Sequence, residues 1–325
     1  MTLFDERKIM SKTAIKISVI GAGFVGSTTA YTLMAKGIAS EIVLFDRKIE
    51  RAEGEVMDIE HGSPFTAETL VRAAGNYDET KDSDIVIITA GAKQEPGETR
   101  LNMATKNAEI MRSIVSEVAP RSPQAILLIV TNPVDVMAYV AREVSGFPKS
   151  RVIGSGTNLD SARLRFTLSK KFGDIDSRDV HAYILGEHGD SEFPAWSLAN
   201  IGGQNIDAAA AQFHVDLSES VKSELGDSIK NAAYEIINRK GATYYGIAMS
   251  VARICEAILR DERSIIPLSV LLNGEYGIDD VYLSVPVIVG EHGIEKILTP
   301  HLTDDEMGKL HNSANVLKEA RAGLN

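Results

Sequence analysis

A glycine-rich turn near the start of the chain constrains the fold more than any other segment. Residues 15–20 form a short apolar run, and the motif G-A-G-F-V-G at residues 21–26 follows it directly and opens a helical pattern. In this spacing Gly21 permits a tight turn, Gly23 lets the backbone approach a pyrophosphate, and Gly26 allows close packing of helix and strand. The motif alone is weak, but its place between a strand and a helix predicts a dinucleotide-binding unit.

An acidic residue at a fitting distance strengthens this prediction. Asp46 follows the next apolar run, residues 41–45, and lies 20 positions beyond Gly26. Its carboxylate can accept hydrogen bonds from both ribose hydroxyls and would repel a 2′-phosphate, so the sequence favours NAD over NADP. Arg47 follows directly and could weaken this preference. The plainer alternative is a glycine turn beside a solvated aspartate.

Short apolar runs alternate with helical patterns through the first half of the chain. Strands are expected at residues 15–20, 41–45, 70–73, 85–89 and 125–130, and helices at 24–36, 50–60 and 102–119. Such alternation is typical of an α/β protein and predicts a Rossmann-type, doubly wound parallel sheet.

The pattern changes after about residue 150. Helices are expected at residues 161–171, 217–259 with an interruption near Gly241, and 304–322, and strands at 180–185, 264–272 and 281–289. We therefore expect three parts: an N-terminal extension at 1–13, an NAD-binding Rossmann domain at 14–153, and an α+β catalytic or substrate domain at 154–325.

Composition narrows the range of partners. The 325 residues carry 34 Lys plus Arg against 45 Asp plus Glu, and the net charge of −11 argues against a nucleic-acid surface or an anionic membrane. The single cysteine, Cys255, excludes an intramolecular disulfide and fits a reducing compartment. No apolar run approaches the ~20 residues of a membrane helix, and no signal peptide is recognisable, so we expect a cytoplasmic protein.

A polar loop follows the expected strand at 85–89. Residues 91–100, G-A-K-Q-E-P-G-E-T-R, lie where doubly wound folds bind their ligands. Pro96 and Gly97 make this segment rich in turns, so it could act as a lid, and Arg100 at its end could polarise a carbonyl group. Taken alone, Arg100 is better explained as a solvated charge at a helix start.

A second motif, T-N-P-V-D at residues 131–135, follows the strand at 125–130. Asn132 could donate a hydrogen bond to a substrate oxygen, and we predict a cis Asn132–Pro133 peptide bond that aims this side chain. The alternative is an ordinary turn with Pro133 near the start of a helix.

A carboxylate, an arginine and a histidine suit the reduction of a 2-oxo acid. Asp160 and Arg163 share one face of a predicted helix, and His188 lies in the motif G-E-H-G-D at 186–190. A buried Asp160 could fix one tautomer of His188 and stabilise its charged form. Arg163 could bind a substrate carboxylate through two hydrogen bonds.

The tetrapeptide G-E-H-G occurs twice, so it does not identify a catalytic histidine by itself. The second copy, at residues 290–293, precedes a helix-like run, and we interpret His292 as an ordinary turn residue. The remaining histidines show no spacing typical of a metal pair, and no metal is expected.

Taken together, these blocks resemble the lactate/malate dehydrogenase family, and within it the bacterial L-lactate dehydrogenases. The resemblance runs from about residue 15 to the last helix and includes the longer motifs G-T-N-L-D-S-A-R, G-E-H-G-D-S-E and K-G-A-T-Y-Y-G-I-A. It implies reversible hydride transfer between NADH and pyruvate, giving L-lactate. His188 would be the proton donor and acceptor, with Asp160 as its partner, Arg163 as the carboxylate clamp and Arg100 on a closing loop.

The resemblance also implies two sets of contacts. The substrate pocket would be lined by Gln94, Arg100, Asn132, Asp160, Arg163 and Thr243. NAD would be bound by Gly21, Gly23, Val25, Gly26, Asp46, Arg51, Tyr77, Gly91, Ala92, Ser113, Val130, Asn132 and Ile247. Arg51 is a mild departure, since many relatives carry lysine there.

Gln94 bears on the choice of substrate. Malate dehydrogenases that resemble this chain carry arginine at this position, where it pairs with the second carboxylate of oxaloacetate. A neutral Gln94 would leave that carboxylate desolvated without a charged partner, at a cost of several kcal/mol, which favours pyruvate. Lys93 is adjacent and could weaken this argument, and longer 2-oxo acids stay open.

Arg165 and His181 match positions that bind fructose 1,6-bisphosphate across a subunit interface in allosteric bacterial relatives, which implies a homotetramer with a possible effector. Phosphates suit an arginine with a protonatable histidine. The plainer alternative is an ordinary interface pair, and Asp174, Asp176 and Asp179 lie nearby in the sequence.

For the function of the whole chain, the alternatives are a malate or broader L-2-hydroxyacid dehydrogenase, or a non-catalytic NAD-binding protein.

Overall fold

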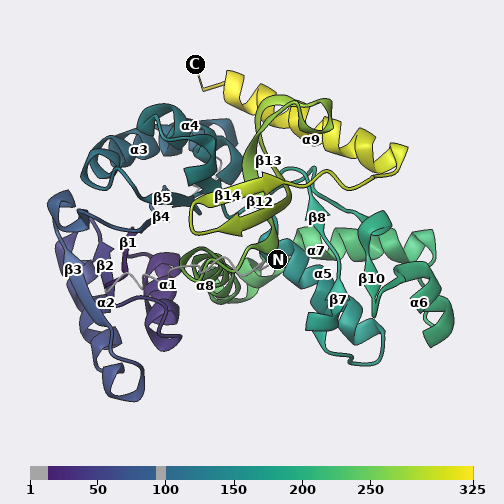
Figure 1. Ribbon diagram of the computed structural model, residues 1–325, viewed down its shortest axis with the longest axis horizontal. Coiled ribbons are helices and arrows are strands. Elements are labelled where there is room, and N and C mark those ends of the chain that lie inside the picture. The colour runs from purple at the N-terminus through teal and green to yellow at the C-terminus, as the bar shows by residue number, and fades with distance from the viewer. Residues whose placement is uncertain (1–13, 93–99, 325) are drawn as a thin grey trace, which may run out of the picture.

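A nine-stranded sheet forms the centre of the protein (Figure 1). The computed structural model describes residues 14–92 and 100–324, without the side chains of Arg100 and Leu101. Six parallel strands come from the first half: β1 (Lys16–Ile20), β2 (Glu41–Phe45), β3 (Leu70–Ala74), β4 (Ile85–Ile88), β5 (Ile126–Ile129) and β6 (Val152–Gly154). Their order in space, β3-β2-β1-β4-β5-β6, confirms the predicted doubly wound sheet.

Helices connect these strands and cover both faces of the sheet, as parallel strands require. They are α1 (Phe24–Ala35), α2 (Ile49–Glu60), α3 (Arg100–Arg121) and α4 (Val134–Ser145). Every residue of β4 and β5 is buried, which explains why these two strands read as unbroken apolar runs. Within the described residues, no helix is long and apolar enough to cross a membrane.

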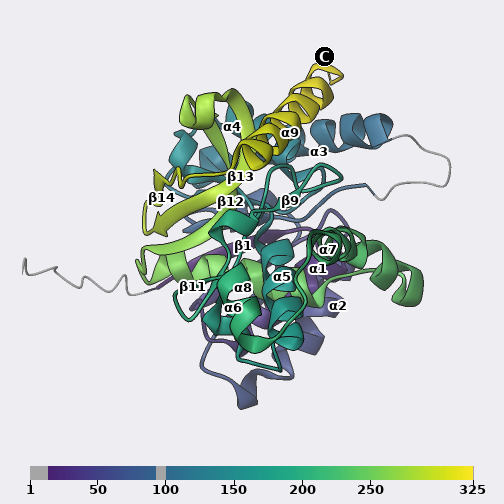
Figure 2. The same cartoon turned by 90° about the vertical axis from the view of Figure 1, so that its right-hand side faces the viewer.

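The second half contributes five helices among the described residues: α5 (Asn158–Lys171), α6 (Ile206–Phe213), α7 (Glu219–Lys240), α8 (Tyr245–Leu259) and α9 (Asp304–Ala322). Short 3-10 helices occur at Ser63–Phe65, Tyr77–Thr80, Lys149–Arg151, Ser177–Asp179, Trp196–Leu198 and Glu275–Gly277. Both views show α9 along the upper edge of the molecule, ending at the C-terminus (Figures 1 and 2).

Three antiparallel strands of the second half extend the sheet of the first half. β12 (Ser264–Asn273), β13 (Asp279–Gly290) and β14 (Gly293–Ile297) join it where Ser269 pairs with Gly154 of β6. A β-carbon on Gly154 would lie 2.8 Å from that of Ser269, so glycine permits this close approach. The main hydrophobic core is therefore shared by both halves, whereas a smaller core lies among α5, α6 and α7.

Two secondary-structure predictions are wrong. The run 180–185 is not one strand, because it divides into β7 (Val180–His181) and β8 (Ile184–Leu185). Strand β7 pairs with β10 (Asn200–Ile201), which also pairs with β11 (Gln204–Asn205). Strand β8 pairs with β9 (Phe193–Pro194). The run after the second G-E-H-G motif is strand β14 rather than a helix. It pairs with β13 in a tight hairpin whose two-residue turn is Glu291–His292, and Gly293 directly after this turn has a φ of 87°.

Candidate active site

The glycine motif forms the predicted turn between β1 and α1. Gly21 has a φ of 111°, in the left-handed region. A β-carbon on Gly26 would lie 1.7 Å from the carbonyl oxygen of Gly21, and one on Gly23 would face the guanidinium of Arg51 at 3.9 Å. In the described part of the chain, no side chain caps the start of α1. The turn thus combines a close backbone approach, a helix N-terminus and an arginine, which fits the pyrophosphate of NAD.

Asp46 follows β2 beside this turn. Its Oδ2 accepts a hydrogen bond from the N–H of Ala22 at 2.9 Å, and its Oδ1 accepts one from the N–H of Lys48 at 2.9 Å. Each carboxylate oxygen keeps a further lone pair for a ribose hydroxyl. Tyr77 stacks on Phe45 with ring centroids 4.2 Å apart, so it lies against the same strand end.

The carboxyl ends of β4 and β5 bring together further residues of the predicted cofactor set. Gly91 and Ala92 follow β4, and Val130 and Asn132 follow β5. The buried Asn107 of α3 joins the two segments, because its Oδ1 accepts from the N–H of Ala92 at 2.7 Å and its Nδ2 donates to the carbonyl of Asn132 at 2.8 Å. Asn107 was not predicted from the sequence, because it belongs to no recognised motif.

Other predicted residues are more scattered. The Asn132–Pro133 peptide bond is cis, as predicted. Ser113 is exposed on α3, Thr243 lies in the turn between α7 and α8, and Ile247 is half-buried in the first turn of α8. No hydrogen bond joins Thr243 to His188 among the described residues.

The predicted substrate selector and the predicted loop arginine fall outside what the structure describes. Gln94 lies outside the described residues. Arg100 is the first residue of α3, and its side chain also lies outside the described part.

The structure brings together the three remaining predicted catalytic residues. His188 follows β8, and Asp160 and Arg163 lie on α5. The Nδ1 of His188 lies 2.7 Å from Oδ2 of Asp160, and Nη1 of Arg163 donates to Oδ1 of the same carboxylate at 2.5 Å. The Asp160 side chain is 2% exposed and the His188 side chain 27% exposed. One buried carboxylate therefore orients both a histidine and an arginine beside accessible space.

The charges of this group reinforce one another. Burial opposes the charged form of His188, but the Asp160 carboxylate outweighs it and raises the pKa of the imidazole to about 9. Burial likewise opposes ionisation of Asp160, yet His188 and Arg163 together hold its pKa below the usual value. At neutral pH the pair therefore consists of an imidazolium and a carboxylate, ready to donate a proton.

A second carboxylate, missed by the sequence analysis, positions the histidine backbone. Oδ2 of the buried Asp135 accepts from the N–H of His188 at 2.9 Å, and its Oδ1 accepts from Oγ of Ser269 at 2.5 Å. Burial raises the pKa of Asp135 to about 6 despite these two bonds. Asp135 is the last residue of the motif T-N-P-V-D and lies in the first turn of the mostly apolar helix α4, where a buried acid needs partners. An acid within an apolar helical run was therefore the sequence signal that could have identified Asp135.

Arg165 and His181 line one cavity of about 250 Å³, together with Arg253. Burial lowers the pKa of Arg165, while nearby Tyr183 opposes this shift and Arg253 adds to it. The described lining holds two arginines and one histidine but no acid, and Arg253 also pairs with Glu262 at 2.6 Å. Two of the three nearby aspartates have other partners: Asp174 pairs with Lys170 and Asp176 with Arg178.

A Rossmann domain whose sheet edge carries a glycine turn and a buried histidine–aspartate pair defines a dinucleotide-dependent oxidoreductase. The chain belongs to the lactate/malate dehydrogenase family: residues 15–154 match the NAD binding domain of that family, and residues 157–323 match its alpha/beta C-terminal domain.

Individual relatives agree with this family. The chain is 53% identical over 309 residues to L-lactate dehydrogenase 1 of Clostridium acetobutylicum, covering 95% of this chain and 98% of that protein. It is 52% identical over 309 residues to L-lactate dehydrogenase of Acetivibrio thermocellus, covering 95% and 97%. The crystal structure of the minor L-lactate dehydrogenase from Enterococcus mundtii superposes with a TM-score of 0.93 at 43% identity, covering 97% and 99%.

Proposed function

We propose that this chain is an NAD-dependent L-lactate dehydrogenase that interconverts pyruvate and L-lactate, with His188 as proton donor and acceptor. The observation that carries this proposal is the Asp160–His188 pair with Arg163 bound to the same carboxylate. The names of the relatives support the same activity. A purely structural NAD-binding protein would have no physical need for this buried charged group.

The cofactor would lie along the carboxyl edge of the sheet. The Gly21–Gly26 turn and Arg51 would hold its pyrophosphate, Asp46 its ribose, and the segments after β4 and β5 its nicotinamide half. When bound, NADH supplies the hydride that reduces the substrate carbonyl carbon.

The protein residues supply binding and the proton. Arg163 pairs with the substrate carboxylate, while Asp160 keeps its guanidinium in place. The protonated Nε2 of His188 donates its proton to the carbonyl oxygen, and Nδ1 stays bonded to Asp160. Asp160 stabilises the imidazolium before transfer, and the same steps run backward for lactate oxidation. By family resemblance, Arg100 polarises the carbonyl, and Asn132 and Thr243 line the pocket.

Gln94 makes pyruvate the preferred substrate, because a second substrate carboxylate would lack a charged partner. Malate dehydrogenase and a broader L-2-hydroxyacid dehydrogenase are the alternatives.

The cavity with Arg165, His181 and Arg253 fits a phosphate-bearing effector, so activation by fructose 1,6-bisphosphate belongs to this proposal. A cytoplasmic homotetramer follows from the family resemblance.

A comparison of substrates tests this function. We expect the purified protein to oxidise NADH faster with pyruvate than with oxaloacetate or 2-oxoisocaproate. A preference for oxaloacetate would refute Gln94 as the selector, and no turnover with any of the three would favour a non-catalytic NAD-binding protein.

A further inference from the structure

A third acid lies near the catalytic histidine, besides Asp160 and Asp135, and the mechanism above does not use it. Oε2 of Glu192 is 3.9 Å from Nδ1 of His188, and the Glu192 side chain is only 5% exposed. A ring nitrogen of His188 and one carboxylate oxygen each from Asp160 and Glu192 all lie within 4.8 Å of one another. Burying a carboxyl group costs free energy unless it has a partner, so its position beside the histidine needs an explanation.

We propose that Glu192 is a positioning residue for the catalytic proton: its buried carboxyl group lies 3.9 Å from Nδ1 of His188 and helps to hold the proton on this ring in alkaline solution. This inference rests on the proposed function of His188. In this role, Glu192 extends the pH range over which the enzyme reduces pyruvate.

The charges around Glu192 explain this behaviour. Burial, and after it the negative charge of Asp160, raises the pKa of Glu192 to about 8. The charges of His188, Arg163 and Lys230 lower this pKa in part. Below this pH, Glu192 adds no negative charge that would repel an anionic substrate. Above it, the new carboxylate stabilises the imidazolium of His188 at 3.9 Å.

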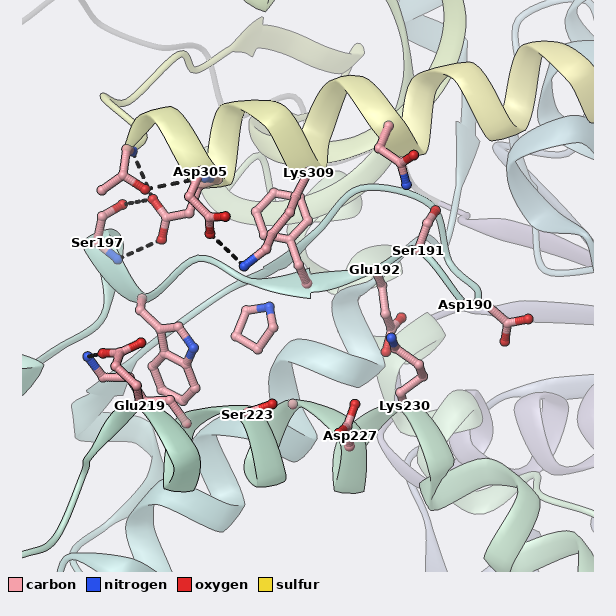
Figure 3. A pocket seen from close by; sticks show the side chains of 18 of the residues that line it. Asp190, Ser191, Glu192, Ser197, Glu219, Ser223, Asp227, Lys230, Asp305 and Lys309 are labelled. Carbon is pink, nitrogen blue, oxygen red and sulfur yellow. Dashed lines mark hydrogen bonds and ion pairs between the residues drawn. The ribbon is translucent and has the colours of Figure 1, made fainter.

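Glu192 also has its own route to water. It lines a cavity of about 560 Å³ between α7 and α9, in which Asp227 and Lys230 lie along α7 (Figure 3). Figure 3 shows the Glu192 side chain directed from the strand segment toward Lys230. Water in this cavity can exchange a proton with Glu192 without entering the substrate site.

The test compares Glu192→Gln with Asp227→Asn across a pH series. Asp227 lines the same cavity but is exposed, and none of the described contacts joins its carboxylate to His188, so its variant controls for loss of one acid. We expect the alkaline decline of kcat/KM for pyruvate to shift down by about one pH unit in Glu192→Gln and to stay in place in Asp227→Asn. An unshifted decline in Glu192→Gln, or an equal loss of activity at every pH, would overturn the proposal.

A measurement on the unmodified protein covers the case in which Glu192→Gln does not fold or the wild type does not turn over. NMR of the histidine ring, with the signal assigned through His188→Gln, should show two inflections for His188, one from Glu192 and one from its own ionisation. A single inflection would overturn the proposal. Absent turnover with two inflections would refute the proposed function and leave the Glu192–His188 coupling intact.

Discussion

Asp160 lies 28 positions before His188 in the sequence, and yet its Oδ2 is 2.7 Å from Nδ1 of the histidine. The other oxygen of Asp160 accepts a hydrogen bond from Arg163. A single buried carboxylate thus sets both the protonation of the histidine and the position of the arginine, so its effects should be visible in pH dependence.

The first prediction concerns turnover and pH. Pyruvate reduction needs the charged His188, whose pKa is raised to about 9. We expect kcat/KM for pyruvate to stay level up to about pH 9 and then fall roughly tenfold per pH unit, while lactate oxidation rises over the same range. A decline centred near the ordinary histidine value of 6.5 would contradict the assigned pair.

The second prediction concerns stability. A histidine whose folded pKa lies above its unfolded value stabilises the fold fully below about 6.5, and loses this contribution as pH rises through about 9. Asp160→Asn should therefore lower the free energy of unfolding more near pH 6 than near pH 10. Urea denaturation at both pH values measures the difference, and an equal loss at both would contradict it.

The turn that follows β1 leads to the third prediction. Gly26→Ala would place a β-carbon 1.7 Å from the carbonyl of Gly21, so the backbone must move. We expect loss of NADH binding, measured by fluorescence titration, and a lower melting temperature. Gly54→Ala is the matched control: Gly54 lies in α2 with nothing within 4 Å of its β-carbon position, and alanine there should stabilise the helix by about 1 kcal/mol.

The fourth prediction concerns the positively charged cavity. The double variant Arg165→Gln/His181→Gln should abolish any activation by fructose 1,6-bisphosphate and leave the unstimulated rate intact. Arg178→Gln is the control, because Arg178 is exposed and pairs with Asp176. Steady-state rates with and without the effector measure this activation. Activation that persists in the double variant would contradict the assignment of this cavity as the effector site.

Local patterns predicted the sheet well, because strands such as β4 are buried on both faces and read as unbroken apolar runs. Local patterns could not predict that β12 would join β6, since Gly154 and Ser269, which pair closely there, lie far apart in the sequence. They also failed for β14, whose short run of mixed residues becomes a strand by pairing with β13.

The site was predictable where a motif gave the residue a known task, as for His188, Asp160 and Arg163. Residues that hold other residues were missed. Asn107 and Asp135 act through hydrogen bonds to segments 15 and 53 positions away, which sequence spacing does not encode. Such supporting groups become visible only when the fold brings the segments together.

The most direct test of the account is replacement of the catalytic histidine. Sequence offers a matched control, because His292 lies in the second G-E-H-G motif with its side chain 84% exposed. We predict that His188→Gln lowers kcat for pyruvate by about 10²–10⁴-fold with NADH binding retained, and that His292→Gln changes neither. Near wild-type turnover in His188→Gln would contradict the assignment of His188 as the proton donor.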